Sequence, residues 1–190
     1  MAEWMEHEST KDKGTNSSME GTRENREIVR WYPPPLGMIK INTAACVNVI
    51  KGRTGLGTVG RDECGKILAA WGFSERKRRN LEQEEAEAIR LGLINAKAED
   101  WNCMGIQSSN KVNWINTYSY QHTILEDIHI LNSLFSICSF SFLNNIVNEV
   151  SSNNAQYALV RCRDFVLKES FLLWMTEIAQ KDLGYLSLTL

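Results

Sequence analysis

The chain has 190 residues, of which 43% are hydrophobic, with a net charge of −2 at pH 7 and a pI of about 6.0. This length and hydrophobic content suit a single domain with a packed core. The near-neutral charge excludes a global attraction to nucleic acid or acidic membranes, so such binding would need a local basic patch. The five cysteines are odd in number and include no C-x-x-C pair, which favours reduced intracellular thiols over a zinc site.

The first 30 residues are rich in Glu, Lys, Asn, Ser and Thr and contain almost no aliphatic side chains. Such a segment cannot bury enough surface to offset its ordering entropy, so residues 1–30 are expected to form a disordered leader. Glu3, Glu6 and Glu8 occupy the place where a secretory signal needs an apolar run. We therefore expect an intracellular protein of the nucleus or cytoplasm, not secreted and without a membrane partner.

Three strands are expected in the first part of the domain. Residues 38–49 are rich in β-forming side chains with period-two alternation, and residues 57–61 and 66–73 follow after short turns. Residues 62–65 have the composition of a hairpin loop. Connections this short predict three consecutive antiparallel strands.

A helix is expected next, from Asn80 to about Lys97. Asn80 and Gln83 have the spacing of a capping box, in which each side chain bonds the backbone N–H of the other residue. Glu85 borders the apolar stripe of this helix. The stripe consists of four residues at helical spacing: Ala86, Ile89, Leu93 and Ala96.

The second half is predicted as a fourth strand at residues 103–108, parallel to the first, a short helix from about Lys111 and a helix at residues 124–135. Alternating Ser and Phe predict a fifth strand at residues 139–142, and residues 154–167 are predicted as a helix.

This order of elements predicts an α/β fold with a mixed five-stranded sheet flanked by helices. The domain is expected to span residues 31–167, followed by a C-terminal helical tail at residues 168–190.

A series of short motifs supports a closer assignment. In chain order they are Trp31 with Pro33-Pro34-Pro35, Gly37-Met38-Ile39-Lys40-Ile41-Asn42, Gly55-Leu56-Gly57, Arg61-Asp62, Gly65-Lys66-Ile67-Leu68 and Glu85-Ala86-Glu87-Ala88-Ile89-Arg90-Leu91-Gly92-Leu93. This series, with weaker matches at residues 106–111 and 153–159, resembles the ribonuclease H type-1 domain of plant non-LTR retrotransposon reverse transcriptases and related plant proteins. The resemblance covers residues 31–163 and implies a ribonuclease H-like fold with an RNA–DNA hybrid or another nucleic acid as partner.

The resemblance also implies a chemistry and its residues. Enzymes of this family hydrolyse the RNA strand of a hybrid with two divalent metals, and several carboxylates must hold ions only about 4 Å apart. By the motifs, the four acidic positions fall on Ala44, Glu85, Ser109 and Tyr157, with Gln107 at a neighbouring acid. Glu85 alone is acidic, and one carboxylate makes a weak Mg²⁺ site.

The leading hypothesis is thus a nucleic-acid-binding ribonuclease H-like domain of retroelement descent with a degenerate active site, for which Mg²⁺ is a cofactor only if activity persists. An active hybrid ribonuclease with substitute ligands stays open. A protein-interaction module also stays open, using four apolar side chains of the tail: Phe171, Leu172, Trp174 and Met175.

Two of these sequence features also have explanations that involve no catalytic or binding role. Glu85 could be a first-turn acid favoured by the helix dipole. A basic run is a candidate nucleic-acid contact or nuclear signal, with a solvated loop as the alternative, and consists of Arg76, Lys77, Arg78 and Arg79.

Overall fold

The computed structural model describes residues 30–76, 80–109, 120–143 and 145–184. The expected leader up to residue 29, the basic residues 77–79 and the short helix expected from Lys111 lie outside these ranges. The described elements are β1 (Ile39–Asn48), β2 (Arg53–Arg61), β3 (Ile67–Glu75), α1 (Leu81–Ala98), β4 (Cys103–Ser108), α2 (Tyr120–Asn132), β5 (Ile137–Phe142), the 3-10 turn η1 (Asn145–Val147), α3 (Glu149–Arg161), β6 (Phe165–Leu167) and α4 (Leu173–Asp182).

The strands form one mixed sheet in the order β5-β4-β1-β2-β3-β6. β1, β2 and β3 are consecutive antiparallel neighbours, whereas β4 and β5 run parallel to β1. The predicted α/β class and mixed sheet are confirmed. The prediction of five strands is wrong, because β6 pairs with β3 and makes a sixth.

The sixth strand arises where the sequence predicted a continuous helix over residues 154–167. α3 begins earlier and ends at Arg161, because Cys162 adopts a left-handed conformation with φ of 52°. The chain then pairs Phe165 with Gly72 of β3. A side chain at Gly72 would place its Cβ 2.2 Å from the Phe165 ring, so the absence of one makes room for this pairing.

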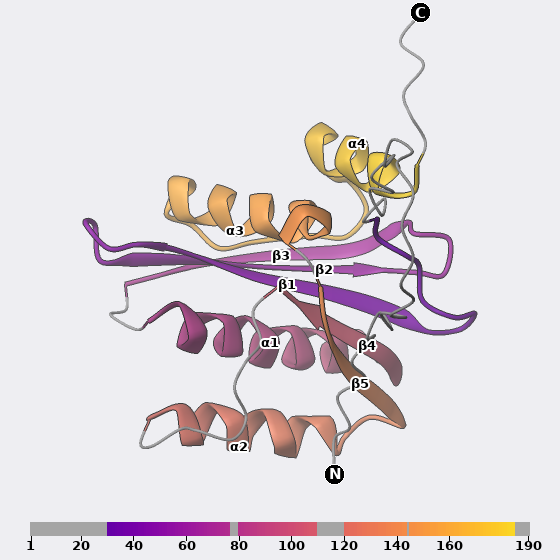
Figure 1. Cartoon of the computed structure of the whole chain (residues 1–190), viewed down its shortest axis with the longest axis horizontal. Coiled ribbons are helices and arrows are strands. Elements are labelled where there is room, and N and C mark those ends of the chain that lie inside the picture. The colour runs from indigo at the N-terminus through magenta and orange to yellow at the C-terminus, as the bar shows by residue number, and fades with distance from the viewer. Residues whose placement is uncertain (1–29, 77–79, 110–119, 144, 185–190) are drawn as a thin grey trace, which may run out of the picture.

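Helices cover both faces of the sheet. Figure 1 shows α1 and α2 on one face and α3 and α4 on the other. The core on the α1 side consists of Ile41, Ala86, Ile89, Leu93, Ala96, Met104, Ile106, Ile124, Ile128, Phe135 and Phe140. The core on the α4 side consists of Val59, Ile67, Ala70, Val150, Met175 and Ala179. Over the ranges that the structure describes, no helix is long and apolar enough to cross a membrane.

The helix α1 starts as the sequence predicts. The backbone N–H of Gln83 donates to Asn80 Oδ1 at 2.9 Å, and the backbone N–H of Asn80 donates to Gln83 Oε1 at 3.2 Å. This capping box satisfies donors that the first helical turn leaves unpaired. It fixes the start of the helix and therefore the direction of Glu85, which is only 3% exposed.

The C-terminal residues pack into the domain. Met175 is fully buried in the second core, and Phe171, Leu172 and Trp174 pack against that core. These are the four side chains that the interaction-module hypothesis required on the surface. They contribute to the domain's own packing, so this observation counts against that hypothesis.

A buried cation fastens α4 to the sheet. The Arg61 guanidinium donates to Asp182 at 2.9 Å, to the Ala179 carbonyl at 2.8 Å and to the Gly65 carbonyl at 3.2 Å, and it lies 4.0 Å from the centre of the Trp31 ring. Burial lowers the pKa of Arg61 and raises the pKa of Asp182, and their mutual attraction only partly offsets either shift. The pair is thus costly to bury and becomes costlier when one member is removed.

Arg61→Met is expected to lower the free energy of unfolding by about 3–5 kcal/mol, because it leaves the Asp182 carboxylate buried without its cation. The double variant Arg61→Met/Asp182→Leu should lose clearly less than the sum of the single losses. Urea unfolding followed by tryptophan fluorescence measures both, with Lys66→Ala as an exposed control. Strictly additive losses would contradict the coupling.

Candidate active site

Glu85 is held by two hydrogen bonds from different strands. Its Oε1 accepts the backbone N–H of Ala45 at 3.0 Å, and its Oε2 accepts the hydroxyl of Ser108 at 2.9 Å. β4 ends at Ser108, opposite Thr43, so the backbone of Ala45 has no neighbour in β4. The carboxyl group of α1 thereby completes the hydrogen bonding at the end of this strand pair.

Burial raises the pKa of Glu85 to about 7, and the hydrogen bonds from Ala45 and Ser108 oppose the shift only in part. Near neutral pH the group is consequently divided between its charged and neutral forms. Each oxygen accepts one hydrogen bond, so about two of the four lone-pair sites of the carboxylate remain for any further ligand.

The strand register brings Ala44 and Ser109 together beside Glu85. The last paired residues of β1 and β4 are Thr43 and Ser108, and Ala44 and Ser109 are the next residue on each strand. Ala44 is 3% exposed and pairs on its other side with Gly57. The structure thus gathers three of the positions singled out in the sequence, of which one carries a carboxylate.

The fourth position lies elsewhere. The Tyr157 ring packs edge-on against Phe165, 5.3 Å between ring centres, and lies 6.3 Å from the ring centre of Trp174. Its neighbour Gln156 reaches β1 instead, with Oε1 at 2.8 Å from the Cys46 thiol. Cys46 shares a face of β1 with Ala44, because they are two residues apart. The geometry therefore places Gln156, rather than Tyr157, on the Ala44 side of α3.

The sequence interpretation missed Gln156, Cys46, Ser108 and Asn148. Asn148 is 1% exposed and donates its side-chain N–H to the Thr43 carbonyl at 2.9 Å, which ties the start of α3 to β1. If the sequence had placed the start of α3 at residue 149, the helical spacing of its buried residues would have shown that Gln156 and Tyr157 point to different sides of the helix.

Gln107 links three strands rather than offering an anionic ligand. Its Oε1 accepts from Asn42 at 3.4 Å, and its Nε2 donates to Ser141 at 3.2 Å. The described part of the basic run is Arg76, which is exposed at the end of β3. Lys77, Arg78 and Arg79 lie outside the described residues.

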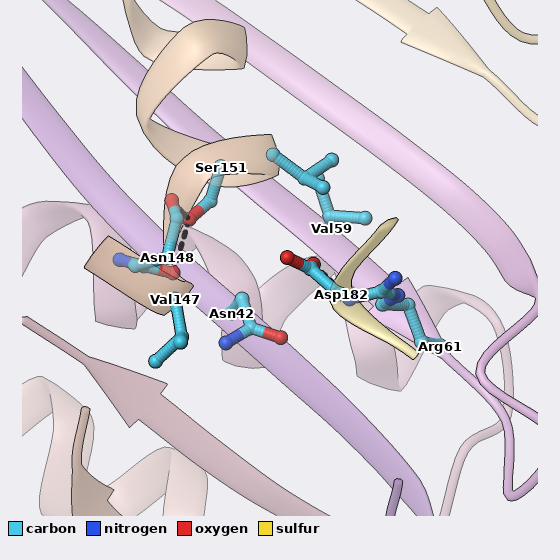
Figure 2. A pocket seen from close by; sticks show the side chains of 8 residues that line it. Asn42, Val59, Arg61, Val147, Asn148, Ser151 and Asp182 are labelled. Atoms are coloured by element: carbon cyan, nitrogen blue, oxygen red, sulfur yellow. Dashed lines mark hydrogen bonds and ion pairs between the residues drawn. The ribbon is translucent and has the colours of Figure 1, made fainter. Parts of the chain in front are cut away.

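Figure 2 shows a narrow pocket on the neighbouring part of the sheet, between β1, β2 and the start of α3. Its polar side chains are mutually satisfied: Ser151 donates to Asn148 Oδ1 at 2.5 Å, and Arg61 pairs with Asp182. The pocket has no room for a water-sized sphere. It is a packing seam between α3, α4 and the sheet.

The donor set around Glu85 does not match a pair of divalent ions. Such ions need several anionic oxygens, whereas Ala44 provides no ligand atom and Ser109 provides a neutral hydroxyl. In the described part of the chain, no three His, Cys, Asp or Glu side chains are grouped so that they could hold a metal ion.

No known protein-family model and no curated protein matches this sequence. Solved structures do match the fold. RNase H1 from the halophilic archaeon Halobacterium salinarum NRC-1 aligns with a TM-score of 0.59 at 14% identity, over 66% of this chain and 99% of that one. The N-terminal RNase H domain of Rv2228c from Mycobacterium tuberculosis aligns with a TM-score of 0.59 at 15% identity, over 64% and 98%. LC11-RNase H1, solved in complex with an RNA/DNA hybrid, aligns with a TM-score of 0.57 at 15% identity, over 65% and 98%.

The chain therefore has the ribonuclease H-like fold, and it contains nearly the full length of these domains. At such identities the likeness establishes the fold, and the activity has to be judged from the chain's own residues.

The raised pKa of Glu85 gives a stability test. The folded state holds the proton of the Glu85 carboxyl group more tightly than the unfolded state does. The stability that this protonation adds is therefore complete below about pH 4.5 and is lost as the pH rises through about 7. Relative to Glu85→Gln, the wild type should lose about 3 kcal/mol of unfolding free energy over this window.

Urea unfolding at several pH values between about 4.5 and 8 measures this difference, with Glu82→Gln on the exposed side of the same turn as the control. Parallel pH profiles for the wild type and Glu85→Gln would show that the Glu85 pKa is not raised.

Proposed function

We propose that this chain is a ribonuclease H-like nucleic-acid-binding domain whose hydrolytic activity is impaired. One observation carries the proposal: the only carboxylate among the gathered positions is Glu85, and both of its oxygens already accept hydrogen bonds from the protein. A site of this kind stabilises the fold and lacks the charge to hold two divalent ions.

Nucleic acid as the partner is supported by the fold, which is shared with a domain solved in complex with an RNA/DNA hybrid. Descent from a retroelement is part of the same proposal. It rests on the motif series between Trp31 and Leu93, which resembles plant retrotransposon domains.

Substitution by nearby acids is the competing proposal, and the geometry favours it less. Glu87 is engaged in a two-pronged pair with Arg90 at 2.7 and 2.9 Å. Asp62 accepts backbone N–H groups within its own hairpin, from Cys64 at 3.0 Å and Lys66 at 2.8 Å. Each of these carboxylates is thus committed to a local role away from Ala44.

The purified 190-residue chain is expected to bind a labelled RNA–DNA hybrid without cleaving it in Mg²⁺ or Mn²⁺. Because the ligand set is incomplete, Glu85→Gln should leave the background rate of cleavage unchanged. Gel analysis of the labelled RNA strand measures the cleavage. Metal-dependent hydrolysis that disappears in Glu85→Gln would overturn the proposed impairment.

A repair experiment tests the register of the site. Ala44→Asp/Ser109→Asp/Gln156→Asp is expected to gain metal-dependent hybrid cleavage, whereas the same set with Tyr157→Asp in place of Gln156→Asp should not, because Tyr157 faces Phe165 and Trp174. A rise of the melting temperature with Mn²⁺ reports metal binding independently of cleavage.

Gain of both properties in the Tyr157 set alone would show that the assignment of Gln156 is wrong. Melting without metal confirms that each variant is folded before the two sets are compared.

A further inference from the structure

Arginines from three distant parts of the sequence meet at one end of the sheet. Arg53 opens β2, Arg76 follows β3, and Arg161 and Arg163 lie at the end of α3. Figure 1 shows the turn between β1 and β2 and the C-terminal end of α3 at the same end of the molecule. We call these four residues the arginine cluster.

Ser74 holds this end together. Arg53 donates to the Ser74 hydroxyl at 3.0 Å, and the backbone N–H of Ser74 donates to the Asp164 carboxylate at 2.8 Å. Arg76 is two residues beyond Ser74, and Arg163 directly precedes Asp164. The two hydrogen bonds therefore fix the strand end that carries Arg76 against the segment that carries Arg163.

The cluster has an excess of positive charge that faces solvent. Arg76, Arg161 and Arg163 are exposed, whereas the acids next to them are Glu75 and Asp164. Within the described ranges, Arg76 and Arg163 take part in no ion pair, and Arg161 lies over the Tyr157 ring at 5.3 Å. The helix dipole accounts for a cation at Arg161 but not for those on the neighbouring strand ends.

We propose that the arginine cluster is the surface by which this domain holds the phosphate backbone of a nucleic acid. The inference rests on the proposed function and locates its partner on the fold. Planar guanidinium groups suit phosphate oxygens because they donate two parallel hydrogen bonds. The cluster offers no amide or carboxylate reserved for base edges, so the contact reads charge and not sequence.

The arginine cluster lies near the degenerate site along the direction of the strands. Ala45, which binds Glu85, pairs with Leu56, and Thr54 pairs with Glu75 only two residues further along β2. A strand rises by about 3.3 Å per residue, so the end of β3 at Glu75 lies about 7 Å along the strands from the level of Glu85, although α1 and α3 cover opposite faces of the sheet.

Fluorescence anisotropy of the 190-residue chain tests this surface over a range of salt, with a labelled RNA–DNA hybrid, a DNA duplex and a single-stranded RNA as probes. Arg161→Ala/Arg163→Ala is expected to weaken duplex binding about 10- to 30-fold near 0.15 M salt and to reduce the salt slope by about 2. Arg161→Lys/Arg163→Lys should keep most of the slope, since it keeps the charge.

Arg30→Ala/Lys66→Ala is the matched control, because both residues are exposed and lie at the opposite end of the sheet. Arg30 lies over the ring of Tyr32, whose carbonyl accepts from Lys40 at the start of β1, and Lys66 precedes β3. Lys66 is eight residues of β3 away from Ser74, about 25 Å at the usual rise, well beyond the screening length of about 8–10 Å. This control should leave both affinity and slope unchanged.

Equal losses in the cluster variant and in the control, with wild-type binding intact, would overturn this inference and leave the proposed function standing. Absence of wild-type binding to all three nucleic acids at low salt would overturn both. Cluster-dependent binding to phosphatidylserine vesicles without binding to nucleic acid would assign the arginines to a membrane surface and overturn the inference.

Discussion

The Glu85 carboxyl group joins α1 to β1 and β4 at the point where the parallel strand pair ends. A buried acceptor of the Ala45 N–H cannot be removed without leaving that donor unsatisfied, which costs more than an average hydrogen bond contributes. An acid at this position therefore has a structural role that is independent of metal binding. A favourable interaction with the helix dipole explains Glu85 less well, because the acids in the first turn of α1 are Glu82 and Glu84. The carboxyl group of Glu85 instead accepts hydrogen bonds from Ala45 and Ser108. Its presence alone does not indicate catalysis.

Local chemistry explains why the sequence predicts the front of the domain well. The three-strand meander depends on alternation and short turns, and α1 depends on the Asn80 and Gln83 cap, all of which are encoded within a few residues. The positions of Ala44 and Ser109 also follow from strand order, since parallel neighbours of a sheet bring their C-terminal ends together. The helical period of the apolar stripe was enough to predict that Glu85 faces the sheet.

Long-range pairing explains what the sequence did not predict. β6 has three residues, too few for a period, and exists because Gly72 leaves space for Phe165. The role of Arg61 depends on Ala179 and Asp182, more than a hundred residues away. Arginines are mostly exposed, so an arginine at a strand end is not expected from the sequence to be buried. The choice between adjacent side chains on α3 needs the helix start, because each residue turns the direction by about 100°.

The neutral residues beside Glu85 affect the electrostatics of this part of the domain in one direction. A nuclease site with several carboxylates repels phosphate unless dications compensate it, so binding and metal loading are tied together. Here Ala44 and Ser109 are neutral, and Glu85, with a pKa of about 7, carries only part of a charge near neutral pH. The arginine cluster at the adjoining end of the sheet is therefore not opposed by several carboxylates at these positions. If the proposed function holds, the neutral residues Ala44 and Ser109 favour a polyanion that is bound without metal, and binding is then separate from hydrolysis on this fold.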